Sequence, residues 1–151
     1  METNSWIEIS EKIATLDKII LSQWEHTVRH RLDENKKESV IILLDHMPEI
    51  LENLSKALKR GTRDDIELAR AHGFQRAVLT QFTLADILNE FSALRETLIS
   101  YLYPMGDTEV VKYVHRYIDS LVKNSVLEFI QHQKSAEKMK PDPGPKNPGL
   151  S

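Results

Sequence analysis

The stretch FTLADILNEFSALRETLISYLYPMG, residues 82–106, predicts one complete α-helix with a marked start and a marked end. Thr83 followed by Asp86 three residues later resembles a capping box, with Asp in place of the usual Glu or Gln. Pro104 and Gly106 end the helix, because proline lacks the backbone N–H that a further turn requires. The apolar residues between these signals recur at helical spacing, and we expect all of them to be buried: Leu84, Ile87, Leu88, Phe91, Leu94, Leu98 and Leu102.

The same spacing of three and four residues extends over most of the chain. Pro48 predicts a break near Asp45–Met47 and a new helix from Pro48 to Lys59. An N-terminal stripe comprises Trp6, Ile9, Ile13, Leu16, Ile20, Trp24 and Val28. A C-terminal stripe comprises Val111, Val114, Ile118, Leu121, Val122, Ser125, Phe129 and His132. No segment alternates with the period of a strand, so we predict an all-α fold, a helical bundle or globin-like assembly of five to seven helices.

Length and composition limit the classes of protein to which the chain can belong. The 151 residues fit one domain, and the absence of cysteine excludes disulfides, thiolate metal sites and a cysteine nucleophile. The net charge of -3, with both signs interspersed, argues against a nucleic-acid partner. The longest apolar run, Val40 to Leu44, is far shorter than a membrane span, and Met1 to Ile7 is polar. We therefore expect a soluble, cytoplasmic protein without membrane insertion.

The distribution of Pro and Gly suggests where the domain ends. Residues 1–138 carry the helical patterns and are expected to form one signal-input domain. Residues 139–151 are rich in proline and glycine, which is typical of a disordered tail or linker.

The string AHGFQR, residues 71–76, is the most suggestive local feature. A glycine within a helix costs about 1 kcal/mol relative to alanine, so Gly73 indicates close helix packing or a ligand near the backbone. Three interpretations of His72 compete: a hydrogen-bonded structural histidine, a phosphorylatable histidine of a phosphotransfer domain, and a haem-binding histidine. We favour the structural role, because no lysine accompanies His72 and a lone imidazole is a weak haem signal.

The other chemical motifs give no reason to expect an enzyme or a bound cofactor. His26 and His30 are four residues apart, but zinc requires at least one further ligand, so no metal site is predicted. His46 lies beside Pro48 and is interpreted as part of a joint between helices. The chain shows no glycine-rich phosphate loop, catalytic triad or paired catalytic carboxylates.

Three charged residues lie within otherwise apolar stretches: Arg76, Glu90 and Arg95. Arg76 and Glu90 fall on neighbouring helices joined by a short turn, so an ion pair between these helices is sterically possible. The alternative is that each charge faces water and contributes almost nothing to stability. The sequence leaves both alternatives open.

Four short motifs together resemble the RsbRD-type N-terminal domain: His46-Met47-Pro48-Glu49-Ile50-Leu51, His72-Gly73-x-x-Arg76, Phe82-Thr83-Leu84 and Glu90-Phe91-x-x-Leu94-Arg95. The resemblance covers roughly Trp24 to Tyr103; the expected glycine of the turn before Phe82 is absent. That family precedes kinase cores in bacterial sensor histidine kinases of two-component systems, and occurs in stressosome-type co-antagonist proteins. The resemblance implies signal relay to a downstream kinase or signalling domain. Its motif residues of interest are His72, Gly73, Arg76, Glu90 and Arg95.

The predicted first and last helices, Trp6–Leu32 and Thr108–Lys138, are long for a domain of this size. Each would span roughly 40 Å, whereas the radius of gyration of such a globule is about 15 Å. Large apolar stripes left in water are rare in monomers. We therefore predict a homodimer whose contact candidates are Trp6, Ile13, Leu121 and Phe129. The alternative is that these helices fold back and complete the core of a monomer.

Overall fold

The computed structural model describes residues 2–31, 47–60, 66–78, 83–105 and 107–139. Within these ranges the chain forms five α-helices and one short 3-10 helix, without a strand. They are α1 (Glu2–Arg31), α3 (Met47–Arg60), α4 (Ile66–Val78), α5 (Leu84–Leu102), the 3-10 helix η2 (Tyr103–Met105) and α6 (Thr108–Met139). The predicted all-α, bundle-like fold is confirmed.

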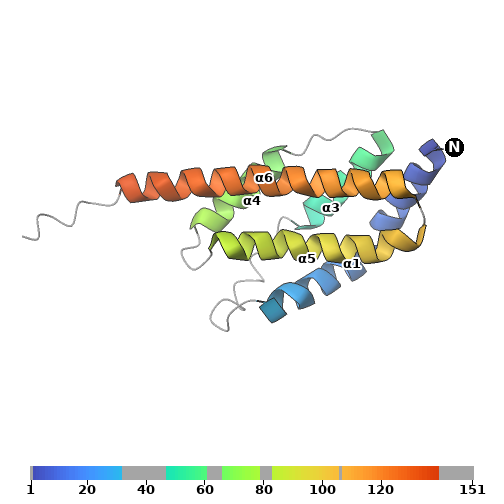
Figure 1. Ribbon diagram of the computed structural model, residues 1–151, viewed down its shortest axis with the longest axis horizontal. Helices are drawn as coiled ribbons and strands as arrows, with labels where there is room; N and C mark the ends of the chain where they lie inside the picture. Colours follow the sequence, from blue (N-terminus) through green and yellow to red (C-terminus); the bar gives the residue numbers. More distant parts are fainter. Residues whose placement is uncertain (1, 32–46, 61–65, 79–82, 106, 140–151) are drawn as a thin grey trace, which may run out of the picture.

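The helices pack as two pairs joined by α5. α3 packs against α1, α4 packs against α6, and α5 contacts both α1 and α6. Figure 1 shows α6 as the longest helix, lying beside α5 and extending at its C-terminal end past the first turn of α5. Because α5 touches both pairs, its side chains are placed to connect all parts of the bundle.

Local signals set several helix ends where the sequence predicts them. The Thr83 hydroxyl accepts the Asp86 N–H at 3.3 Å, and the Asp86 carboxylate accepts the Thr83 N–H at 2.8 Å, so the capping box is confirmed. α3 begins at Met47, directly before Pro48, where a missing N–H costs little. Other predicted features lie outside the described residues: the apolar run Val40–Leu44, His46, the turn before Phe82, and the tail after Met139.

Most members of the apolar stripes of α1 and α6 are buried, as predicted. Their fully buried members include Ile9, Ile20, Trp24, Val114 and Ile118. Within the described helices, none is both long and apolar enough to span a membrane.

The orientation of α5 differs from the prediction. Leu84 and Leu88 were expected in the core, but they are 37% and 44% exposed. The buried side of α5 instead includes the polar residues Asp86, Glu90 and Thr97, alongside Phe91, Leu94 and Leu98. With 3.6 residues per turn, Leu84 and Leu88 lie at the edge of the apolar side that carries Phe91 and Leu98, and the buried side is rotated from this edge toward Glu90 and Thr97.

The predicted dimer contact also needs correction. Ile13, Leu121 and Phe129 are at most 1% exposed in the single chain. Trp6 is partly buried, with its ring 5.0 Å from that of Tyr113 on α6 in an edge-to-face arrangement. These side chains belong to the chain's own core, because α3 and α5 cover α1 while α4 and α5 cover α6. Three of the four contact candidates are thus buried within the single chain, by the helices that pack against α1 and α6.

Candidate functional site

A buried ion pair joins α4 to α5. The Arg76 Nε donates to Glu90 Oε1 at 2.9 Å, and Arg76 Nη2 donates to Glu90 Oε2 at 2.9 Å. Both side chains are fully buried, and Arg76 Nη1 also donates to the side-chain oxygen of Gln75 at 3.0 Å. Of the two alternatives left open by the sequence, the ion pair between helices is confirmed.

His72 extends this ion pair by one helical turn along α4. Its Nε2 lies 3.5 Å from Glu90 Oε2, and its side chain is fully buried. Its ring meets that of Phe91 edge to face, with 5.1 Å between centroids. His72, Arg76 and Glu90, three of the predicted motif residues, therefore form one cluster, hereafter the buried ion cluster.

Trp24 of α1 also reaches Glu90. Its indole Nε1 donates to the Glu90 backbone carbonyl at 2.9 Å. Glu90 is thus held by α4 through its carboxylate and by α1 through its main chain. One residue of α5 consequently links three helices.

The charges of the cluster determine the ionisation of Glu90. Burial acts to raise the pKa of this carboxyl, but the charges and hydrogen bonds of His72 and Arg76 outweigh that effect. The pKa falls from its ordinary value of 4.5 to about 2. Glu90 is therefore a carboxylate at any neutral or mildly acidic pH, and its charge is balanced by groups inside the fold.

Gly73 allows α4 and α6 to cross at very short distance. A Cβ at this position would overlap the Ser125 carbonyl oxygen of α6, so a side chain does not fit here unless the two backbones move apart. The Ser125 hydroxyl donates to the Ala69 carbonyl at 2.8 Å and so fixes the same crossing. The interpretation of Gly73 as a packing glycine is confirmed, since the α6 backbone occupies the space beside it.

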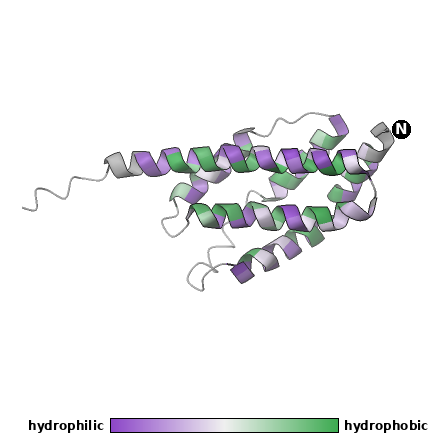
Figure 2. Cartoon of the chain, viewed as in Figure 1, coloured by the Kyte–Doolittle hydropathy of each residue, from purple (hydrophilic) through white to green (hydrophobic). Residues whose placement is uncertain are grey.

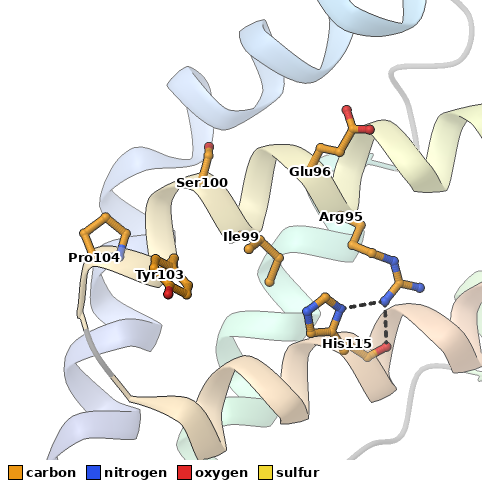
Figure 3. Close-up of a pocket in the computed structure, with 7 residues that line it drawn as sticks. All are labelled: Arg95, Glu96, Ile99, Ser100, Tyr103, Pro104 and His115. Atoms are coloured by element: carbon orange, nitrogen blue, oxygen red, sulfur yellow. Dashed lines mark hydrogen bonds between the residues drawn. The ribbon is translucent and has the colours of Figure 1, made fainter.

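Arg95, the remaining motif residue, lies apart from the buried ion cluster. It contacts α6, where Nη1 lies 2.8 Å from His115 Nδ1 and Nη2 donates to the Asp119 carboxylate. Figure 3 shows Arg95 and Ile99 pointing toward His115 across an open groove, whose lining also includes Glu96, Ser100, Tyr103 and Pro104. The motif therefore divides between a buried part and a surface part.

Several partners of these residues were not identified from the sequence. Trp24 was assigned only to an apolar stripe, and His115 and Asp119 were not singled out. Ser125 interrupts the apolar stripe of α6 with a small polar residue, a signal of the close crossing that the sequence analysis did not use. Because these contacts join positions far apart in the chain, spacing alone does not reveal them.

The buried ion cluster is closed to solvent and its charges are paired. Its charged groups bond to one another, and its side chains are sealed from solvent. Across the described ranges, no three or more His, Asp or Glu side chains stand together in a way that would hold a metal ion.

Comparisons with protein-family models, with curated proteins and with solved structures give no match for this chain. The resemblance to the RsbRD-type domain therefore stays a prediction from the motif residues. Four of these residues, His72, Gly73, Arg76 and Glu90, lie at the contacts of α4 with α5 and α6.

Proposed function

We propose that this chain is a non-catalytic signal-input or protein-interaction domain of a bacterial signalling protein, either a sensor histidine kinase or a stressosome-like protein. The observation that carries the proposal is the exposed apolar surface on the first turns of α5. The buried side of α5 completes the core, while Leu84 and Leu88 lie one turn apart beside it, are 37% and 44% exposed, and form an outer stripe. Exposed apolar surface of this kind marks a contact with another protein.

The proposed occupant of this outer stripe is a second copy of the chain. Figure 2 shows hydrophobic residues on the first turns of α5, and none of the described helices lies in front of α5 in this view. The charges beside the stripe are balanced in pairs, Arg95 with Asp119 and Arg31 with Glu96. In a twofold contact the same surface of each copy faces the other, so an excess of one charge would repel itself. A surface whose charges are balanced is therefore compatible with such a contact.

The buried ion cluster supports a relay through the helices. A displacement of α5 at the dimer contact would move Glu90 and, through Arg76, α4. α4 is fixed to α6 at the Gly73–Ser125 crossing, and α6 continues beyond the bundle toward the C-terminus (Figure 1). Shifts of packed helices are an established means of passing signals between domains. The proposed receiver is a downstream kinase or signalling domain in the cytoplasm.

Two other functions are less well supported. A phosphotransfer domain needs a histidine that a phosphoryl donor can reach, whereas His72 is fully buried. A haem or small-ligand sensor needs a cavity on which polar groups converge. Here the polar groups around His72 contact one another, and Phe91 packs against its ring.

Disulfide crosslinking tests the proposal, since the chain has no cysteine of its own. Leu88→Cys should form a covalent dimer under mild oxidation, because a twofold contact brings the two copies of this stripe together. The matched control is Leu127→Cys, an exposed leucine of α6, which should remain monomeric. Sedimentation equilibrium should show a dimer that Leu84→Glu with Leu88→Glu dissociates. A wild-type chain that sediments only at 17.4 kDa at micromolar concentration would contradict the homodimer.

A further inference from the structure

Two histidines stand together on the solvent side of α1. His26 and His30 are one helical turn apart, both exposed, and their ring centroids are 4.3 Å apart at an angle of 60°. The opposite side of the same turns carries the buried residues Trp24 and Val28. The imidazoles are therefore accessible without any change in the core.

The charges around the two imidazoles are neutralised. Arg29 Nη2 donates to the Glu25 carboxylate at 2.8 Å, and Arg31 Nη2 donates to Glu96 of α5 at 2.6 Å. A cation approaching the pair therefore meets no excess positive charge. α1 ends at Arg31, so the negative end of its helix dipole also lies nearby and favours a bound cation.

We infer that His26 and His30 form a two-imidazole clamp for a late first-row divalent transition-metal ion. Histidines at positions i and i+4 of a helix present their nitrogens to one ion, as in the zinc-binding helices of metalloproteases. Imidazole is a preferred ligand of Cu²⁺, Ni²⁺ and Zn²⁺, and Cu²⁺ binds most tightly in this order of metals. Water completes the coordination, so the ion exchanges readily.

The clamp is independent of the proposed homodimer and lies outside the buried ion cluster. A bound metal ion would link the last two turns of α1 on their solvent-exposed side. Those turns hold Trp24 against Glu90 and Arg31 against Glu96. A ligand that binds only the folded state stabilises it, so the metal should raise the melting temperature of the chain.

Titration of the untagged chain with Cu²⁺, followed by calorimetry and electron paramagnetic resonance, tests the clamp. We expect one tight site per chain, with hyperfine coupling to two imidazole nitrogens. Ni²⁺ and Zn²⁺ should bind more weakly, and Mg²⁺ should not compete. Lowering the pH should weaken binding, because a protonated imidazole has no lone pair for the metal.

Variants of the exposed histidines locate the site without disturbing the core. His26→Gln and His30→Gln should each weaken binding and remove one nitrogen coupling, while His132→Gln on α6 should leave both unchanged. Ser22 is also exposed and lies four residues before His26. Ser22→His in the His30→Gln background therefore recreates the four-residue spacing and should restore metal binding. Unchanged binding in the His26→Gln, His30→Gln double variant would overturn the inference, as would failure of Ser22→His to restore it.

Discussion

Two of the arginine–carboxylate contacts of α5 differ mainly in burial. The inner one, between Glu90 and Arg76, has two parallel hydrogen bonds and no exposed side-chain surface. In the outer one, Arg95 and Asp119 have side chains that are 29% and 68% exposed. If either pair breaks, water can solvate the outer charges but not the inner ones. The comparison teaches that burial, more than the chemistry of the ions, determines how strongly the fold depends on such a pair.

The largest expected effect is that of breaking the inner pair. Arg76→Met leaves the Glu90 carboxylate buried without its arginine partner, and should lower the free energy of unfolding by about 3–5 kcal/mol. Urea denaturation followed by circular dichroism measures this loss.

The double variant Arg76→Met with Glu90→Leu is the control for this prediction. Removing both charges removes the need to solvate either, so much of the lost stability should return. A double variant as unstable as the sum of the two single variants would contradict this account of the pair.

The crossing beside the inner pair gives the next largest effect. Gly73→Ala would gain about 1 kcal/mol at an open helical position. Here the new methyl group would meet the Ser125 carbonyl oxygen, so the variant should instead lose about 1–3 kcal/mol. Thermal unfolding gives the sign directly, and a rise in melting temperature would show that α4 and α6 do not cross this closely.

Acid should weaken the inner pair in a defined pH range. Because folding lowers the pKa of Glu90 from 4.5 to about 2, its carboxylate stabilises the fold fully above pH 4.5. That contribution is lost as the pH falls from about 4.5 toward 2. The difference in unfolding free energy between the wild-type chain and Glu90→Gln should therefore shrink across this range. A difference that stays constant would mean that Glu90 is not ionised in the fold.

The smallest effect is expected at the outer pair. Arg95→Gln should change the unfolding free energy by at most about 1 kcal/mol, since exposed ion pairs contribute little. Added salt should reduce the change further by screening. If Arg95→Gln lowered the free energy of unfolding as much as Arg76→Met, the inner and outer pairs would not differ in their contribution to stability.

The sequence predicts the fold well where the signals are local. Pro48 and the Thr83–Asp86 capping box mark helix starts, because each acts on backbone groups within a few residues. The stripes of α1 and α6 identify their buried sides, since their remaining surface is largely polar. α5 lacks this contrast, and Leu88 was therefore placed in the core although it faces outward.

The candidate site was predictable only in part. Gly73 in mid-helix has a local cost that demands an explanation, and the short turn between helices made the Arg76–Glu90 pair sterically possible. The bond from Trp24 to the Glu90 carbonyl joins residues 66 positions apart, and no local pattern encodes it. Ile13, Leu121 and Phe129 were predicted as dimer contacts but are core residues, because the helices that cover α1 and α6 come from distant parts of the chain.

Because the Trp24 indole donates to Glu90, tryptophan fluorescence can report on the buried ion cluster. Trp24 is fully buried, whereas Trp6, the only other tryptophan, is partly buried at the far end of α1. Replacing Trp6 with phenylalanine would leave one fluorophore, whose donor group touches the residue that links α1, α4 and α5. The emission wavelength of that single indole would then report, in solution and in real time, whether the centre of the bundle is closed or open to water.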